Sequence, residues 1–101
     1  MIAREMFAEL GYEFYDHHCL VIPQSPGVMI PQDAPYIEYY QVDIDDNVEI
    51  IKFYPQGKFI TVDASFRTAG GQHKMTAPLN MAELKAIMKQ CEELGWLREE
   101  E

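Results

Sequence analysis

The first half of this sequence has almost no basic residues. No Lys or Arg lies between Arg4 and Lys52, whereas ten acids fall in the same stretch: Glu5, Glu9, Glu13, Asp16, Asp33, Glu38, Asp43, Asp45, Asp46 and Glu49. The residues from Lys52 onward carry seven bases and seven acids, so the first half supplies the whole net charge of −9. Such a charge repels nucleic acid and anionic membranes and attracts basic protein surfaces. We therefore expect no direct contact with nucleic acid or membrane.

Long hydrophobic runs and cysteine are also scarce. No apolar run approaches the roughly 20 residues that span a bilayer, and the first ten residues contain acids where a signal peptide is apolar. The two cysteines, Cys19 and Cys91, are too few for a disulfide framework. We therefore expect a cytoplasmic protein. Its 101 residues, 48% of them hydrophobic, suffice for a single domain over residues 1–101.

Apolar spacing predicts a helix at each end of an α+β domain. Residues 2–10 have helical periodicity and end at Gly11. A second helix begins at Asn80, where Glu83 has the spacing of a capping box, and ends at Gly95. We expect this helix to bury one apolar stripe, formed by Leu84, Ile87, Met88, Cys91 and Leu94.

Between the helices we expect an antiparallel sheet of about four strands. These strands cover residues 12–22, 36–44, 48–54 and 58–66, and residues 72–76 fit a short edge strand. Residues 36–44 and 48–54 form a hairpin around an acidic turn. Residues 23–35 contain four of the six prolines and are expected to form a loop. The simplest packing places both helices on one face of the sheet.

A run of metal-ligating residue types follows the first helix. Imidazole and thiolate are ligands that zinc prefers, and His17 and Cys19 share one face of a strand. The zinc candidates are His17, His18 and Cys19, with Asp16, His73 and Cys91 as weaker ones. The alternative is a polar turn with a half-buried cysteine. Because His18 points to the opposite face from Cys19, the pair is poorly placed for nucleophilic catalysis, and we do not expect an enzyme.

The acidic hairpin is the candidate docking surface for a basic protein. Tyrosine is favoured at interfaces, and carboxylates complement Lys and Arg on a partner. The candidate partner-binding residues are Glu38, Asp43, Asp45, Asp46 and Glu49, together with Tyr39 and Tyr40. The alternative is a solvated hairpin whose acids maintain solubility and whose aromatic residues belong to the sheet core.

Both ends of the chain resemble small proteins of phages and prophages of Gram-positive bacteria. The resemblance lies in Ala-Arg-Glu-Met-Phe at residues 3–7, Glu-Leu-Gly-Tyr-Glu at 9–13, and the closing helix around residues 81–87 and 92–96. The centre, from Asp16 to the acidic hairpin, departs from that pattern. The resemblance implies a phage accessory protein without a defined activity, and some small acidic phage proteins are anti-CRISPR inhibitors.

Two functional hypotheses follow. The first is a phage-encoded interaction protein that occludes a basic, nucleic-acid-binding surface of a host defence enzyme, such as a CRISPR effector nuclease, in the bacterial cytoplasm. The second is a small zinc-stabilised structural or regulatory phage protein with no electrostatic partner. Zinc content and salt-dependent binding distinguish the two hypotheses.

Overall fold

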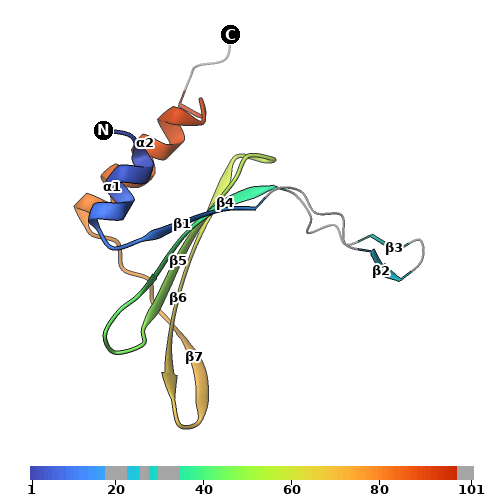
Figure 1. Ribbon diagram of the computed structural model, residues 1–101, viewed down its shortest axis with the longest axis vertical. Coiled ribbons are helices and arrows are strands. Elements are labelled where there is room, and N and C mark those ends of the chain that lie inside the picture. Colours follow the sequence, from blue (N-terminus) through green and yellow to red (C-terminus); the bar gives the residue numbers. More distant parts are fainter. Residues whose placement is uncertain (18–22, 26–27, 30–34, 98–101) are drawn as a thin grey trace.

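The structure, a computed structural model, describes residues 1–17, 23–25, 28–29 and 35–97. The chain begins and ends with a helix, and the strands lie between them in the sequence, which gives an α+β fold (Figure 1). In chain order the elements are α1 (Ala3–Glu9), β1 (Glu13–His17), β2 (Pro23–Ser25), β3 (Val28–Met29), β4 (Tyr36–Val42), β5 (Val48–Tyr54), β6 (Phe59–Thr68), β7 (Gly71–Met75) and α2 (Met81–Glu93). Neither described helix is long and apolar enough to cross a membrane.

The main sheet has five antiparallel strands in the order β1-β4-β5-β6-β7. This is one strand more than the expected four or so, because residues 71–75 pair along their whole length with β6. The expected hairpin is confirmed: β4 and β5 pair from Ile37–Phe53 to Val42–Val48. The segment expected to be a loop contains the short strands β2 and β3, which pair with each other in a separate ribbon (Figure 1).

The two helices end with the same backbone arrangement. Gly11 and Gly95 both have positive φ, of 94° and 78°, a conformation that glycine adopts without steric cost. Beyond each glycine the chain turns back, so that the amide of Tyr12 donates to the Phe7 carbonyl and the amide of Trp96 donates to the Cys91 carbonyl, both at 3.0 Å. This is the six-residue hydrogen bond of a Schellman motif. The predicted helix ends are therefore confirmed.

The core joins both helices to one set of strand side chains. Phe7 of α1 stacks on Tyr39 of β4 at 3.8 Å between ring centroids, and Phe53 of β5 meets both rings edge-on. Ala86, Ile87 and Cys91 of α2 belong to the same cluster. The helices also contact each other directly (Figure 1).

The buried face of α2 differs from the predicted apolar stripe. Ile87 and Cys91 are buried, but Leu84 and Met88 are 42% and 48% exposed. Two polar residues are buried in addition: Glu83 accepts a hydrogen bond from the Tyr12 hydroxyl, and Gln90 accepts one from the Tyr39 hydroxyl. Buried hydroxyls need acceptors. The helix is therefore rotated so that Glu83 and Gln90 face the sheet, and not only the apolar stripe that the spacing of the sequence favours.

Candidate functional site

The sheet presents two faces with different roles. Side chains alternate along a strand, and Tyr39, Ile51 and Phe53 point into the core with the helices. We call this side the core face. The side chains between them point the other way, and we call that side the outer face. On β1, β4, β5 and the start of β6 the outer face carries Glu13, Tyr15, His17, Tyr36, Glu38, Tyr40, Val42, Val48, Ile50, Lys52, Tyr54 and Phe59.

An unbroken row of rings crosses the outer face. His17 stacks on Tyr36 at 4.4 Å between centroids, Tyr36 lies 5.1 Å from Tyr54, and Tyr54 stacks on Phe59 at 4.6 Å. In the other direction Tyr15 lies 6.5 Å from His17 and 6.4 Å from Tyr40. We call these six residues the aromatic row. Two of its members, Tyr15 and Phe59, are exposed, so the row is a surface of rigid apolar area with polar tips.

The acidic turn, residues 43–47, joins β4 to β5. The Asp43 carboxylate accepts hydrogen bonds from the amides of Asp45 at 2.8 Å and Asn47 at 2.9 Å, and from the Asn47 side chain at 2.9 Å. The bonds from Asn47 lower the pKa of Asp43 below its usual value because they stabilise the charged form. Asp43 therefore builds the turn. Ile44 beside it is 98% exposed.

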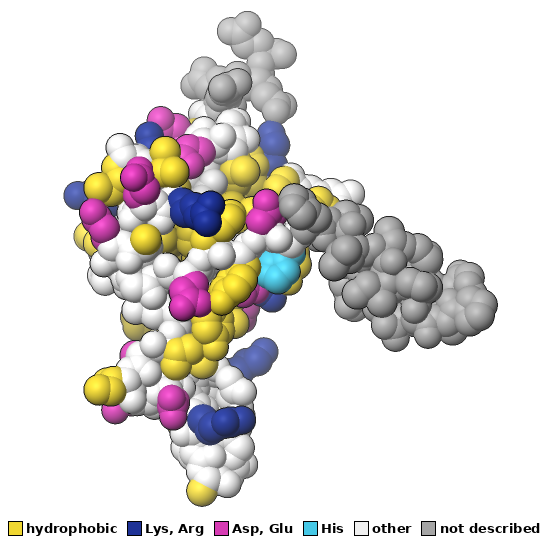
Figure 2. Space-filling model, in the orientation of Figure 1, with side chains coloured by type: hydrophobic (Ala, Val, Ile, Leu, Met, Phe, Trp, Pro, Cys, Tyr) yellow, Lys and Arg dark blue, Asp and Glu magenta, His cyan; other side chains and the backbone are white. Residues whose placement is uncertain are grey.

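The structure does not bring the predicted docking residues together. Glu38 lies on the outer face, whereas Glu49 pairs with Gln41 on the core face. Asp43, Asp45 and Asp46 share the acidic turn, and Tyr40 belongs to the aromatic row. The expectation for Tyr39 was wrong: it is 1% exposed and packs against Phe7. Figure 2 accordingly shows acidic side chains spread over the visible surface among hydrophobic and basic ones.

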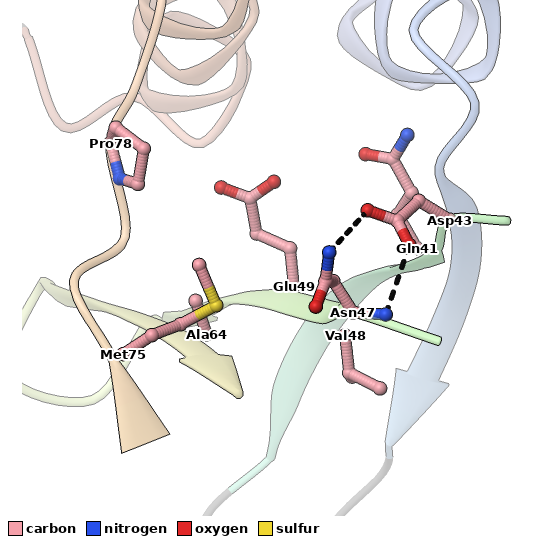
Figure 3. Close-up of a pocket in the computed structure, with 8 residues that line it drawn as sticks. All are labelled: Gln41, Asp43, Asn47, Val48, Glu49, Ala64, Met75 and Pro78. Carbon is pink, nitrogen blue, oxygen red and sulfur yellow. Dashed lines mark hydrogen bonds between the residues drawn. The ribbon is translucent and has the colours of Figure 1, made fainter. Parts of the chain in front are cut away.

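Glu49 instead lines a hollow of about 170 Å³ beside the acidic turn. Figure 3 shows its side chain rising from β5 between Pro78 on one side and Asp43 on the other. Burial raises the pKa of Glu49, and the nearby Glu83 carboxylate raises it further, while a hydrogen bond from Tyr12 acts in the opposite direction. Glu49 is thus part of the packing between the sheet and α2, and it does not share a surface with Glu38.

The predicted metal ligands are dispersed as far as they are described. His17 is on β1 and His73 on β7, which form opposite edges of the main sheet. Cys91 lies on the buried side of α2, and burial raises the pKa of its thiol, so it is a protonated core residue at neutral pH. His18 and Cys19 lie outside the described residues. Among the described residues, no group of three His, Cys, Asp or Glu side chains is close enough to hold a metal ion.

Three surface residues were missed by the sequence reasoning. Tyr15 joins Tyr40 to the rest of the aromatic row, Phe59 ends the row on β6, and Ile44 projects from the acidic turn. The alternation of side chains along β4 and β5 could have predicted the aromatic row, because it places Tyr36, Tyr40 and Tyr54 on the opposite face from Tyr39 and Phe53. Nothing in the sequence distinguished Ile44, because it continues the alternation of the strand before it.

Comparisons with known proteins give no relative for this chain. No protein-family model matches it, and neither the curated proteins nor the solved structures contain a match.

Proposed function

We propose that this protein is a binding protein that docks on a basic protein surface through its outer face and acidic turn. In this proposal α1 and α2 together cover the core face, which leaves the outer face for a partner. The observation that carries the proposal is the aromatic row: six rings in contact across the sheet on the side opposite the core.

The chemistry of this surface suits a protein partner. Tyrosine rings bury a large area at a low cost in conformational entropy and keep a polar tip for hydrogen bonding. The exposed Ile44 offers an apolar anchor at the edge of the surface. Carboxylates at Glu13, Glu38, Asp45 and Asp46 complement Lys and Arg, which gives fast, salt-sensitive association. The net charge of −9 acts in the same direction at longer range.

The concrete form of the proposal is a phage-encoded inhibitor of a host nuclease guided by RNA. Such a nuclease holds nucleic acid in a positively charged channel, and an acidic protein seated there excludes the nucleic acid. This form is supported by the charge of the first half of the chain and by the resemblance of its two ends to phage proteins. It places the protein in the bacterial cytoplasm with its target.

The test is target-DNA cleavage by purified CRISPR effector nucleases, with and without this protein, combined with a binding measurement at low and high salt. Replacing Asp45 and Asp46 with Asn should weaken binding up to about tenfold at low salt, mainly through the association rate. Asp43 is left intact because it builds the turn.

The matched control removes the same two charges elsewhere, by Glu9→Gln and Glu92→Gln on the exposed sides of α1 and α2. This control should bind like the wild type. If both double variants lose affinity equally, the acidic turn has no specific role. If no tested nuclease is bound or inhibited, the inhibitor form of the proposal is excluded.

A further inference from the structure

One end of the aromatic row forms a shallow hollow around a carboxylate. The hollow has a volume of about 410 Å³ and is lined by Tyr15, His17, Glu38 and Tyr40. The rings of Tyr15 and Tyr40 are nearly perpendicular, at 79°, and stand on neighbouring strands. Glu38 on β4 pairs directly with Tyr15 on β1, two residues before Tyr40 on its own strand, and its side chain is only 16% exposed. We call this feature the Glu38 hollow.

A second carboxylate lies at its rim. The Tyr15 hydroxyl donates a hydrogen bond to Glu13 Oε2 at 2.7 Å. This bond raises the pKa of Tyr15, so the ring remains neutral and its face remains electron-rich at physiological pH. Neutral aromatic walls around a carboxylate are the combination that attracts an organic cation, since ring face and carboxylate both favour positive charge.

Among the described residues, neither cationic neighbour of Glu38 forms a hydrogen bond to its carboxylate. His17 Nε2 lies 3.6 Å from Glu38 Oε1, is itself buried, and has no hydrogen-bond partner among the described residues. Lys52 lies opposite Glu38 on β5, but its ammonium is placed over the Tyr36 ring, 5.2 Å from the centroid. The protein also places Arg4 over the Phe14 ring at 4.4 Å, so cation–ring contacts already occur on both faces of its sheet.

We infer that the Glu38 hollow binds an arginine side chain presented by a protein partner. A planar guanidinium stacks on a tyrosine ring while two of its N–H groups donate to one carboxylate, which a lysine ammonium cannot do in the same way. The inference rests on the proposed function and assigns it a specific contact. A second copy of this chain is a poor occupant, because two molecules of net charge −9 repel each other.

The test is an NMR titration with N-acetyl-L-argininamide at low salt, followed on the ring signals of Tyr15, His17 and Tyr40. These signals should shift saturably. N-acetyl-L-citrullinamide, which has the same shape without the charge, should leave them unchanged. Glu38→Gln should weaken argininamide binding at least fivefold, and Lys52→Gln should strengthen it, because it removes a positive charge from the strand beside Glu38. Amide spectra that change only near the substituted residue establish that both variants are folded.

Three results would overturn the inference. They are the absence of saturable shifts, equal shifts with the citrulline compound, and unchanged affinity in Glu38→Gln. Shifts confined to the acidic turn would assign the cation to that turn and also exclude the hollow. The inference and the proposed function can fail separately. If argininamide binds at the hollow but no nuclease is bound, the inference stands and the inhibitor form of the proposed function fails. If a nuclease is bound equally well by Glu38→Gln, only the proposed function is supported.

Discussion

Two tyrosine hydroxyls are buried between the sheet and α2, and each has one acceptor on the helix. Tyr12 donates to Glu83, and Tyr39 donates to Gln90. Glu83 also accepts from the Asn80 amide at 3.1 Å, so a single carboxylate serves both the helix cap and the core. Burial raises the pKa of both tyrosines, which keeps the hydroxyls protonated as donors.

Tyr12→Phe should destabilise the protein by about 1–3 kcal/mol, because it leaves a buried carboxylate oxygen of Glu83 without its donor. Urea unfolding at neutral pH measures the change. Tyr15→Phe is the matched control: it removes a hydroxyl bonded to Glu13 on the surface and should have no measurable effect on stability. Equal losses in the two variants would show that the Tyr12–Glu83 bond has no special weight.

At the scale of single residues, the sequence predicted the helix caps better than the burial of the side chains on α2. Asn80 accepts from the Glu83 amide at 2.8 Å, as the spacing of the two residues indicated. The sequence could not show that Glu83 and Gln90 would be buried while Leu84 and Met88 are exposed. Hydrophobic periodicity counts polar residues as outward-facing, whereas the acceptors needed by Tyr12 and Tyr39 come from tertiary pairing that a local pattern does not contain.

At the scale of the elements, the turn of the β4–β5 hairpin is held by one side chain outside the core. Asp43 holds the amides of Asp45 and Asn47 across the turn, and Asp46 has a positive φ of 61° within it. Aspartate adopts this conformation more readily than most residues. The acids of this turn therefore differ: Asp43 holds the turn together, whereas the Asp45 side chain is exposed.

Asp43→Ala should increase hydrogen exchange at the Asp45 and Asn47 amides, since both lose their acceptor. Asp45→Ala removes the same charge from the same turn and should leave the Asn47 amide protected. In the wild type, the lowered pKa of Asp43 means that its contribution is present above about pH 3.8 and is lost as the pH falls through the lowered pKa. Exchange rates of the Asn47 amide that are the same in both variants would contradict this role.

Strand pairing was predictable where alternation was strict and turn residues were clear, as in β4 and β5. The extra strand β7 escaped a firm assignment because Gly70-Gly71 and its polar sequence carry little apolar signal. The division of the candidate site between two faces followed from the same alternation. Glu38 and Glu49 belong to the two strands of one hairpin. The register pairs Glu38 with Lys52 and Glu49 with Gln41, so the two carboxylates lie on opposite faces of the sheet.

At the scale of the whole molecule, the zinc hypothesis can be tested independently of binding. It predicts about one equivalent of zinc in protein purified without a His-tag, and a melting temperature that falls on chelation. His17→Gln should then release the metal. His73→Gln should retain it, because β1 and β7 are opposite edges of the main sheet. Elemental analysis without zinc, or a melting temperature indifferent to chelator, contradicts this alternative.

The two helices are also tied together at their ends. The Ala3 amide at the start of α1 donates to Glu93 Oε2 at the end of α2, at 2.6 Å, a favourable place for a carboxylate near a helix N-terminus. On the ribosome, Tyr39, Ile51 and Phe53 emerge well before residue 93. The core face of the sheet therefore stays uncovered by α2 until the sheet has been synthesised. During this period a nascent chain is open to aggregation and to capture by chaperones.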